Sequence, residues 1–144
     1  MPITTPINYL AVLVCAILAM ALGFVWYGPL FGKKWMKLVC ADEMTEEQKK
    51  ASMKGMWKLY TTQFLLSLFQ LGVLSWYIWN LREFSKTSVC IAFSIWFAFV
   101  MPTIAGSCMW NGDSKGDAWT KFLIQAGCQL IIFLISGLIL SHWI

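Results

Sequence analysis

Four long runs of residues without Asp, Glu, Lys or Arg constrain this chain more than any other feature of its sequence. The runs are approximately Ile7–Tyr27, Leu59–Trp79, Thr87–Met109 and Phe122–Trp143. Each is long enough to cross about 30 Å of hydrocarbon, which takes about 20 helical residues. A closed β-barrel would need alternating segments of about ten residues, and these runs do not alternate. We therefore expect an all-α fold, a bundle of four transmembrane helices.

The composition leads to the same class of protein. Of the 144 residues, 59% are hydrophobic and 12% are charged, whereas a soluble domain carries roughly 25% charged residues. The charges cluster between the apolar runs, which indicates one integral membrane domain over residues 1–144. No Lys or Arg precedes the first run, so we expect that run to be a retained span and not a cleaved signal peptide.

The distribution of the cations predicts an orientation. Nine of the eleven Lys and Arg residues lie in the first and third loops, residues 28–58 and 110–121, and two, Arg82 and Lys86, lie in the second. Cytoplasmic loops carry the excess of Lys and Arg. The prediction is a multi-pass protein of the inner cell membrane, with these two loops in the cytoplasm and both termini outside (periplasmic or extracellular). The loop lysines favour contact with anionic lipid headgroups, and no basic face for nucleic acid is expected.

The first span ends in a recognisable way. Its aromatic pair Trp26 and Tyr27 is typical of headgroup depth, and the helix is expected to stop at Gly28-Pro29. Gly32, the lysine pair 33–34 and Trp35 follow, with the lysines expected in the aqueous phase and Trp35 at the cytoplasmic interface. This stretch is the candidate interface of the first span.

The first loop contains a predicted short amphipathic helix. The segment Thr45-Glu46-Glu47-Gln48 has the spacing of a capping box, so the helix should begin at Glu46. Glu46 and Lys50 form an i,i+4 pair in the favourable order. Two roles are open: a solvated connector, or a helix that docks on lipid or on a partner.

Small residues recur at every fourth position of the first span. They are Ala11, Cys15, Ala19 and Gly23. Such a stripe lets another helix approach closely, so it predicts a helix-packing face and a possible homo-oligomer.

Four glutamines lie inside the second and fourth spans, Gln63 and Gln70 in one, Gln125 and Gln129 in the other. An amide that faces lipid is costly, so these side chains should point into the bundle. They are either polar contacts between helices or the lining of a polar path.

The sequence offers little for chemistry. No span contains a charged residue, the only histidine is His142, and proton relays or ion coupling generally need an intramembrane ionisable group. No spacing matches a metal site, a phosphate loop or a nucleophile with its base. We assign no catalytic, cofactor-binding or metal-binding residues and expect no enzyme and no cofactor. Two functions are left: a structural or partner- or lipid-binding membrane module, or a small passive channel or transporter with a glutamine-lined path.

Three segments resemble one family. They are Asn8-Tyr9-Leu10-Ala11-Val12-Leu13, then Trp26-Tyr27-Gly28-Pro29 with Phe31-Gly32-Lys33-Lys34-Trp35, and Ala126-Gly127-Cys128-Gln129-Leu130. On these segments the chain resembles the bacterial membrane proteins grouped as domain-of-unknown-function family 1761. The resemblance implies a four-helix membrane protein of similar length. It implies no established activity, so no residue roles are carried over.

Overall fold

The structure is a computed structural model that describes residues 7–84 and 87–143, apart from the side chain of Asp42. The regular elements of this part are all helical: α1 (Tyr9–Val25), η1 (Trp26–Leu30), α2 (Gly32–Leu38), η2 (Ala41–Glu43), α3 (Glu46–Met53), α4 (Met56–Leu81), α5 (Ser88–Ile95), η3 (Trp96–Val100), α6 (Met101–Met109) and α7 (Lys115–Trp143). Four helices are long and apolar enough to cross a membrane: Tyr9–Leu30, Met56–Leu81, Ser88–Met109 and Lys115–Trp143. The all-α prediction with four such helices is confirmed.

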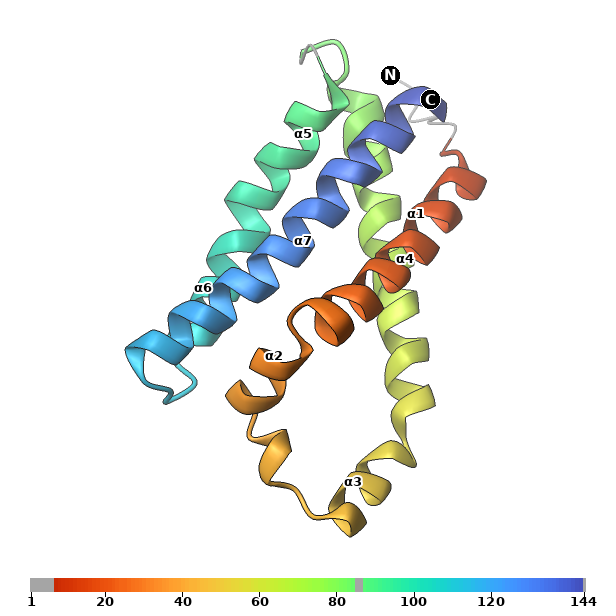
Figure 1. Cartoon of the computed structure of the whole chain (residues 1–144). Helices are drawn as coiled ribbons and strands as arrows, with labels where there is room; N and C mark the ends of the chain where they lie inside the picture. Colours follow the sequence, from red (N-terminus) through yellow and green to blue (C-terminus); the bar gives the residue numbers. More distant parts are fainter. Residues whose placement is uncertain (1–6, 85–86, 144) are drawn as a thin grey trace.

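The helix α7 is central to the arrangement, because it contacts α1, α4, α5 and α6 (Figure 1). The start of α1 and the end of α7 lie at one end of the molecule, where Asn8 Nδ2 donates a hydrogen bond to the Trp143 carbonyl at 3.1 Å. The same side chain caps α1, since Asn8 Oδ1 accepts from the Ala11 amide. The segment with α2 and α3 and the α6–α7 turn both lie at the opposite end, so the two lysine-rich loops share that end.

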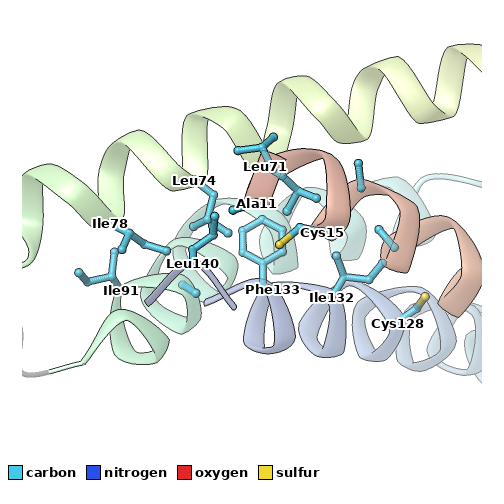
Figure 2. Close-up of a cluster of buried hydrophobic side chains, with 14 residues drawn as sticks. Ala11, Cys15, Leu71, Leu74, Ile78, Ile91, Cys128, Ile132, Phe133 and Leu140 are labelled. Atoms are coloured by element: carbon cyan, nitrogen blue, oxygen red, sulfur yellow. The ribbon is translucent and has the colours of Figure 1, made fainter. Parts of the chain in front are cut away.

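The hydrophobic core lies in the half of the molecule nearer the termini (Figure 2). Phe133 of α7 is enclosed there with Leu71 of α4 and Ala11 of α1. The α4 helix has no buried residue before Ser67. Its first half therefore stands away from the packed core, and this leaves space between α1, α4 and α7.

The small-residue stripe of the first span lies inside the chain. Ala11, Cys15 and Ala19 are buried members of the core, while Gly23 is only partly buried. Other helices of the same chain cover the stripe, because small side chains allow α1 to approach its neighbours closely. A homo-oligomer stays a prediction, and it would need another surface.

The expected stop of the first span at Gly28-Pro29 is wrong in its detail. The helix continues through these residues as a π-helical turn, η1, in which the Phe31 amide donates to the Trp26 carbonyl at 3.0 Å. Proline has no N–H and its ring collides with the carbonyl four residues earlier in a regular helix. Widening the turn relieves that conflict. A second π-helical turn, η3, stands just before Pro102 in the third long helix.

The α3 helix begins at Glu46, as predicted, and Thr45 and Gln48 form the capping box. The ion pair differs from the expected one: Glu46 pairs with Lys49 at 3.7 Å and not with Lys50. The helix has no buried residue. Its docking on lipid or on a partner therefore stays a prediction.

The last long helix begins at Lys115, earlier than the expected Phe122, so the third loop is shorter than 110–121. Ser114 accepts a hydrogen bond from the Asp117 amide at 3.3 Å, in the manner of a helix N-cap. The spacing Ser-x-x-Asp before an apolar run is a start signal that was available in the sequence. Similarly, α4 begins at Met56, ahead of the expected Leu59.

Candidate functional site

The segment between Trp26 and Trp35 folds into an aromatic corner where α1 leads into α2. The ring centroids of Trp26 and Phe31 lie 4.9 Å apart, and so do those of Tyr27 and Trp35. A Cβ atom on Gly32 would lie 3.1 Å from the Tyr27 carbonyl oxygen, so a side chain there would strain the corner. These contacts fix the direction in which α2 leaves the first long helix.

The corner is held against α7 by Trp26. Its indole Nε1 donates to the Ile124 carbonyl at 2.9 Å. Gly127 leaves room for the ring, because a Cβ there would lie 3.3 Å from Trp26 Cζ2. The second and third of the segments that resemble the family, far apart in the sequence, therefore meet in space.

A cavity of about 460 Å³ opens beside this corner, between α1 with η1, α4 and α7. Its polar lining consists of Tyr27, Tyr60, Gln63, Ser67, Gln70 and Gln129, and no charged residue of the described ranges lines it. Met20, Phe24 and Ile132 contribute apolar walls. A largely apolar cavity of this size with a few converging polar groups has the character of a small-molecule site.

Two of the cavity's glutamines also border a second cavity. Gln70 and Gln129 also line a second cavity of about 320 Å³, which is bounded by Val100 and by Thr103 of α6. The Oε1 atom of Gln129 is buried and accepts no hydrogen bond from the residues that the structure describes. Among those residues, Trp96 Nε1 is likewise buried without a partner. A buried amide oxygen without a donor is costly, and water or a ligand would normally satisfy it.

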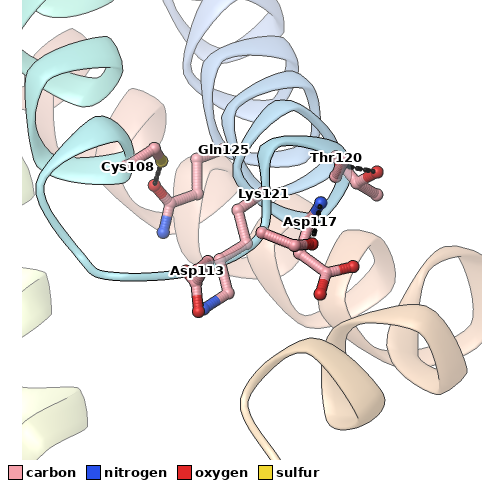
Figure 3. A network of polar contacts seen from close by, with 8 residues as sticks. Cys108, Asp113, Asp117, Thr120, Lys121 and Gln125 are labelled. Atoms are coloured by element: carbon pink, nitrogen blue, oxygen red, sulfur yellow. Dashed lines mark hydrogen bonds and ion pairs between the residues drawn. The ribbon is translucent and has the colours of Figure 1, made fainter.

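Gln125 does not join the other three glutamines. Its Oε1 lies 3.6 Å from Cys108 Sγ, at the end of α6 (Figure 3), and it is not among the residues that line either cavity. The structure thus brings together Gln63, Gln70 and Gln129 of the predicted intramembrane polar set at one cavity, but Gln63 is exposed and not enclosed in the bundle as expected. Gln125 serves a contact between α6 and α7.

Lys121 differs from the other loop lysines. It is only 7% exposed, and its Nζ lies 2.7 Å from Asp113 Oδ2 in the α6–α7 turn (Figure 3). A buried ammonium needs such a partner. The pair closes the turn, so Lys121 is not available to lipid headgroups, whereas Lys33, Lys34 and Lys37 on α2 are exposed.

The described residues that line the cavity do not form a set of metal ligands. Across the described part of the chain, no three or more His, Cys, Asp or Glu side chains group closely enough to hold a metal ion. The five cysteines are free, and Cys128 contributes to the cavity wall. The cavity can therefore form hydrogen bonds with a ligand through its amide and hydroxyl side chains, which stand among apolar side chains.

The described part of the chain is therefore all-α, with four helices of membrane length and, between three of them, a largely apolar cavity with a few uncharged polar groups. Residues 10–141 match the family model described as "Protein of unknown function (DUF1761)". The chain belongs to this family, as the resemblance implied. Comparisons with curated proteins and with solved structures give no match.

Proposed function

We propose that the chain is a multi-pass protein of the inner cell membrane, with its termini outside and its lysine-rich loops in the cytoplasm. Large apolar side chains are exposed along all four long helices, for example Leu18, Leu66, Phe99 and Leu138. A surface of this kind needs an apolar environment. The exposed hydroxyls of Thr61 and Thr62 donate to carbonyls of their own helix at 2.8 Å, as a helix in lipid requires.

The surface of α2 supports a lipid-facing role for this end of the molecule. Lys33, Lys34 and Lys37 are exposed on a short helix that also presents Met36. Cations beside apolar side chains suit the boundary between anionic headgroups and acyl chains. The anionic lipid contact proposed from the sequence thus rests on α2, and not on Lys121.

The activity that we propose is binding, without catalysis, of a small amphipathic ligand in the glutamine-lined cavity. The observation that carries this proposal is the cavity itself, in which amides from α4 and α7 converge without a charged group. Tyr27 and Gly28 from one family-like segment and Cys128 and Gln129 from another contribute to its walls. Such a cavity is what a lipid-binding membrane module requires.

A passive channel or transporter is the second candidate. The observation in its favour is that Gln70 and Gln129 line both cavities, so the two spaces adjoin the same pair of amides. A continuous polar path would predict flux of small uncharged solutes into proteoliposomes. A binding module predicts no flux above empty vesicles.

A variant that fills the cavity tests the binding function. A Cβ on Gly23 would have no atom within 4 Å, and Gly23 lines the cavity, so the side chain of Gly23→Leu can start into the cavity without a clash at its Cβ and should occupy it. The matched control is Gly72→Leu, which also has open space but lies outside the cavity. Native mass spectrometry of protein purified in mild detergent should show one bound small molecule in the wild type and in Gly72→Leu, and none in Gly23→Leu. Equal occupancy in all three would disprove binding at this site.

A further inference from the structure

We infer that the cavity takes an uncharged amphiphile whose head group carries a hydrogen-bond donor, such as a monoacylglycerol, and that Gln129 Oε1 accepts that hydrogen bond. The inference rests on the proposed binding function and names the ligand class for the same site. It follows from three properties of the cavity: its charge, its hydrogen-bonding groups and its open side.

The first property is the absence of charge from the lining. Among the residues that the structure describes, no Asp, Glu, Lys, Arg or His lines the larger cavity or the adjoining one. A carboxylate or phosphate in such a place would lose its hydration without gaining a counter-charge, and this costs far more than burying a neutral group. Fatty acids and phospholipid headgroups are therefore poor ligands for the inner end of the cavity.

The second property is the unmatched acceptor. Gln129 Oε1 is buried and receives no hydrogen bond from the described residues, and Gln70 lines the same two cavities. The hydroxyl of Ser67 is already used, since it donates to the Gln63 carbonyl at 2.9 Å. This oxygen has no surface open to the cavity, so the amide of Gln129, which lines the cavity, must turn before a ligand hydroxyl can donate to it and satisfy it. A ligand without a donor would leave it unpaired.

The third property is the open side between α1 and α4. Phe24 and Tyr60 line the cavity and are 56% and 43% exposed, with their ring centroids 5.3 Å apart. The two rings contact each other across α1 and α4, and an acyl chain would pass beside them toward the exposed face of α4, where Leu59 and Leu66 also lie. A head group at the glutamines and an acyl chain that leaves beside Phe24 and Tyr60 would match this pattern.

Three probes with the same acyl chain separate the properties of the head group. Monooleoylglycerol is uncharged and has donors, methyl oleate is uncharged without a donor, and oleate is charged without a donor. We expect saturable binding of monooleoylglycerol to the purified protein, with a Kd at least about tenfold lower than that of either other probe, the scale of one hydrogen bond to an otherwise unpaired group. Gln129→Met, which keeps the length of the side chain, should raise the Kd of monooleoylglycerol to that of methyl oleate. The control Gln125→Met should leave it unchanged.

The outcomes distinguish the ligand class from the site. If oleate or methyl oleate binds as tightly as monooleoylglycerol, and Gly23→Leu abolishes that binding, the ligand class is wrong and the cavity still binds. If no probe binds saturably, the inference is overturned, and the mass spectrometry of Gly23→Leu decides the proposed function separately. If Gln129→Met does not fold, the order of the three probes on the wild type still decides.

Discussion

At the scale of single residues, a few polar side chains connect parts of the chain that are distant in sequence. Asn8 connects the start of α1 to the Trp143 carbonyl, Trp26 connects η1 to the Ile124 carbonyl, and Lys121 closes the α6–α7 turn through Asp113. The Trp26 and Lys121 bonds are partly buried, where water competes less for them, whereas the Asn8 bond is exposed.

Replacing Trp26 tests this role. Trp26→Phe keeps an aromatic ring but removes the only donor to the Ile124 carbonyl among the described side chains. We expect the free energy of unfolding, measured by titration with SDS in mixed micelles, to fall by about 0.5–1.5 kcal/mol. The control is Trp110→Phe, because Trp110 is 88% exposed and should change stability little. Equal effects of the two substitutions would contradict the role of the indole hydrogen bond.

At the scale of elements, α5 and α7 approach each other closely at Gly137. A Cβ on Gly137 would lie 3.0 Å from Ala92 Cβ and 3.3 Å from the Ser88 carbonyl oxygen. Two of the three nearest atoms belong to the backbone of α5, so a side chain at position 137 has no flexible neighbour to displace. The glycine is what allows these two helices to touch.

A single methyl group should therefore separate α5 from α7. Gly137→Ala overpacks this contact, and we expect it to lower the free energy of unfolding by about 1–3 kcal/mol in the same SDS titration. Gly72→Ala is the matched control, since its Cβ would meet nothing within 4 Å. Alanine is a better helix former than glycine, so the control should be neutral or should stabilise by up to about 1 kcal/mol. A stable Gly137→Ala protein would show that α5 and α7 are less tightly apposed.

At the scale of the whole molecule, the two halves differ. The core lies toward the termini (Figure 2), and the cavity extends from the middle of the bundle toward the lysine-rich loops, with Leu71 and Ile132 among the residues that belong to both. A packed half that keeps four helices in place allows the other half to leave space between α1 and α4. The aromatic corner, which leads into α2 and its exposed lysines, therefore lies at the cavity end of the molecule.

The proposed orientation can be tested with thiols at the two ends. Cys40 is exposed in the lysine-rich first loop, and Phe84, in the connection from α4 to α5, is 85% exposed. In intact spheroplasts, a membrane-impermeant maleimide should modify Phe84→Cys and leave Cys40 unmodified, as peptide mass mapping would show. Cys40 should react once the membrane is broken. The opposite pattern in intact spheroplasts would reverse the orientation.

The number and type of the long helices followed from the sequence, because apolar length without charge has few solutions. The start of α3 followed as well, since a capping box acts within four residues. The start of α7 was also encoded locally, by Ser114 and Asp117. The π-helical turn at Pro29 was not foreseen, because proline can end, bend or widen a helix and the neighbouring contacts select among these.

The candidate site was predictable only in its residue types. Gln125 and Gln129 lie four residues apart, so helical periodicity assigns them to one face. Gln125 contacts Cys108 at the end of α6, whereas Gln129 lines the cavities. The difference arises because α6 packs against Gln125 and leaves space beside Gln129. The small-residue stripe likewise indicates close packing but cannot say whether the neighbour belongs to the same chain.

The sequence by itself determined that four uncharged helices form, because hydropathy and hydrogen bonding along the backbone are local properties. Only the tertiary structure decided that α1 and α4 diverge beside α7 and leave a neutral cavity with an unmatched amide. Space between helices depends on how side chains distant in sequence fill it, and no local pattern records that.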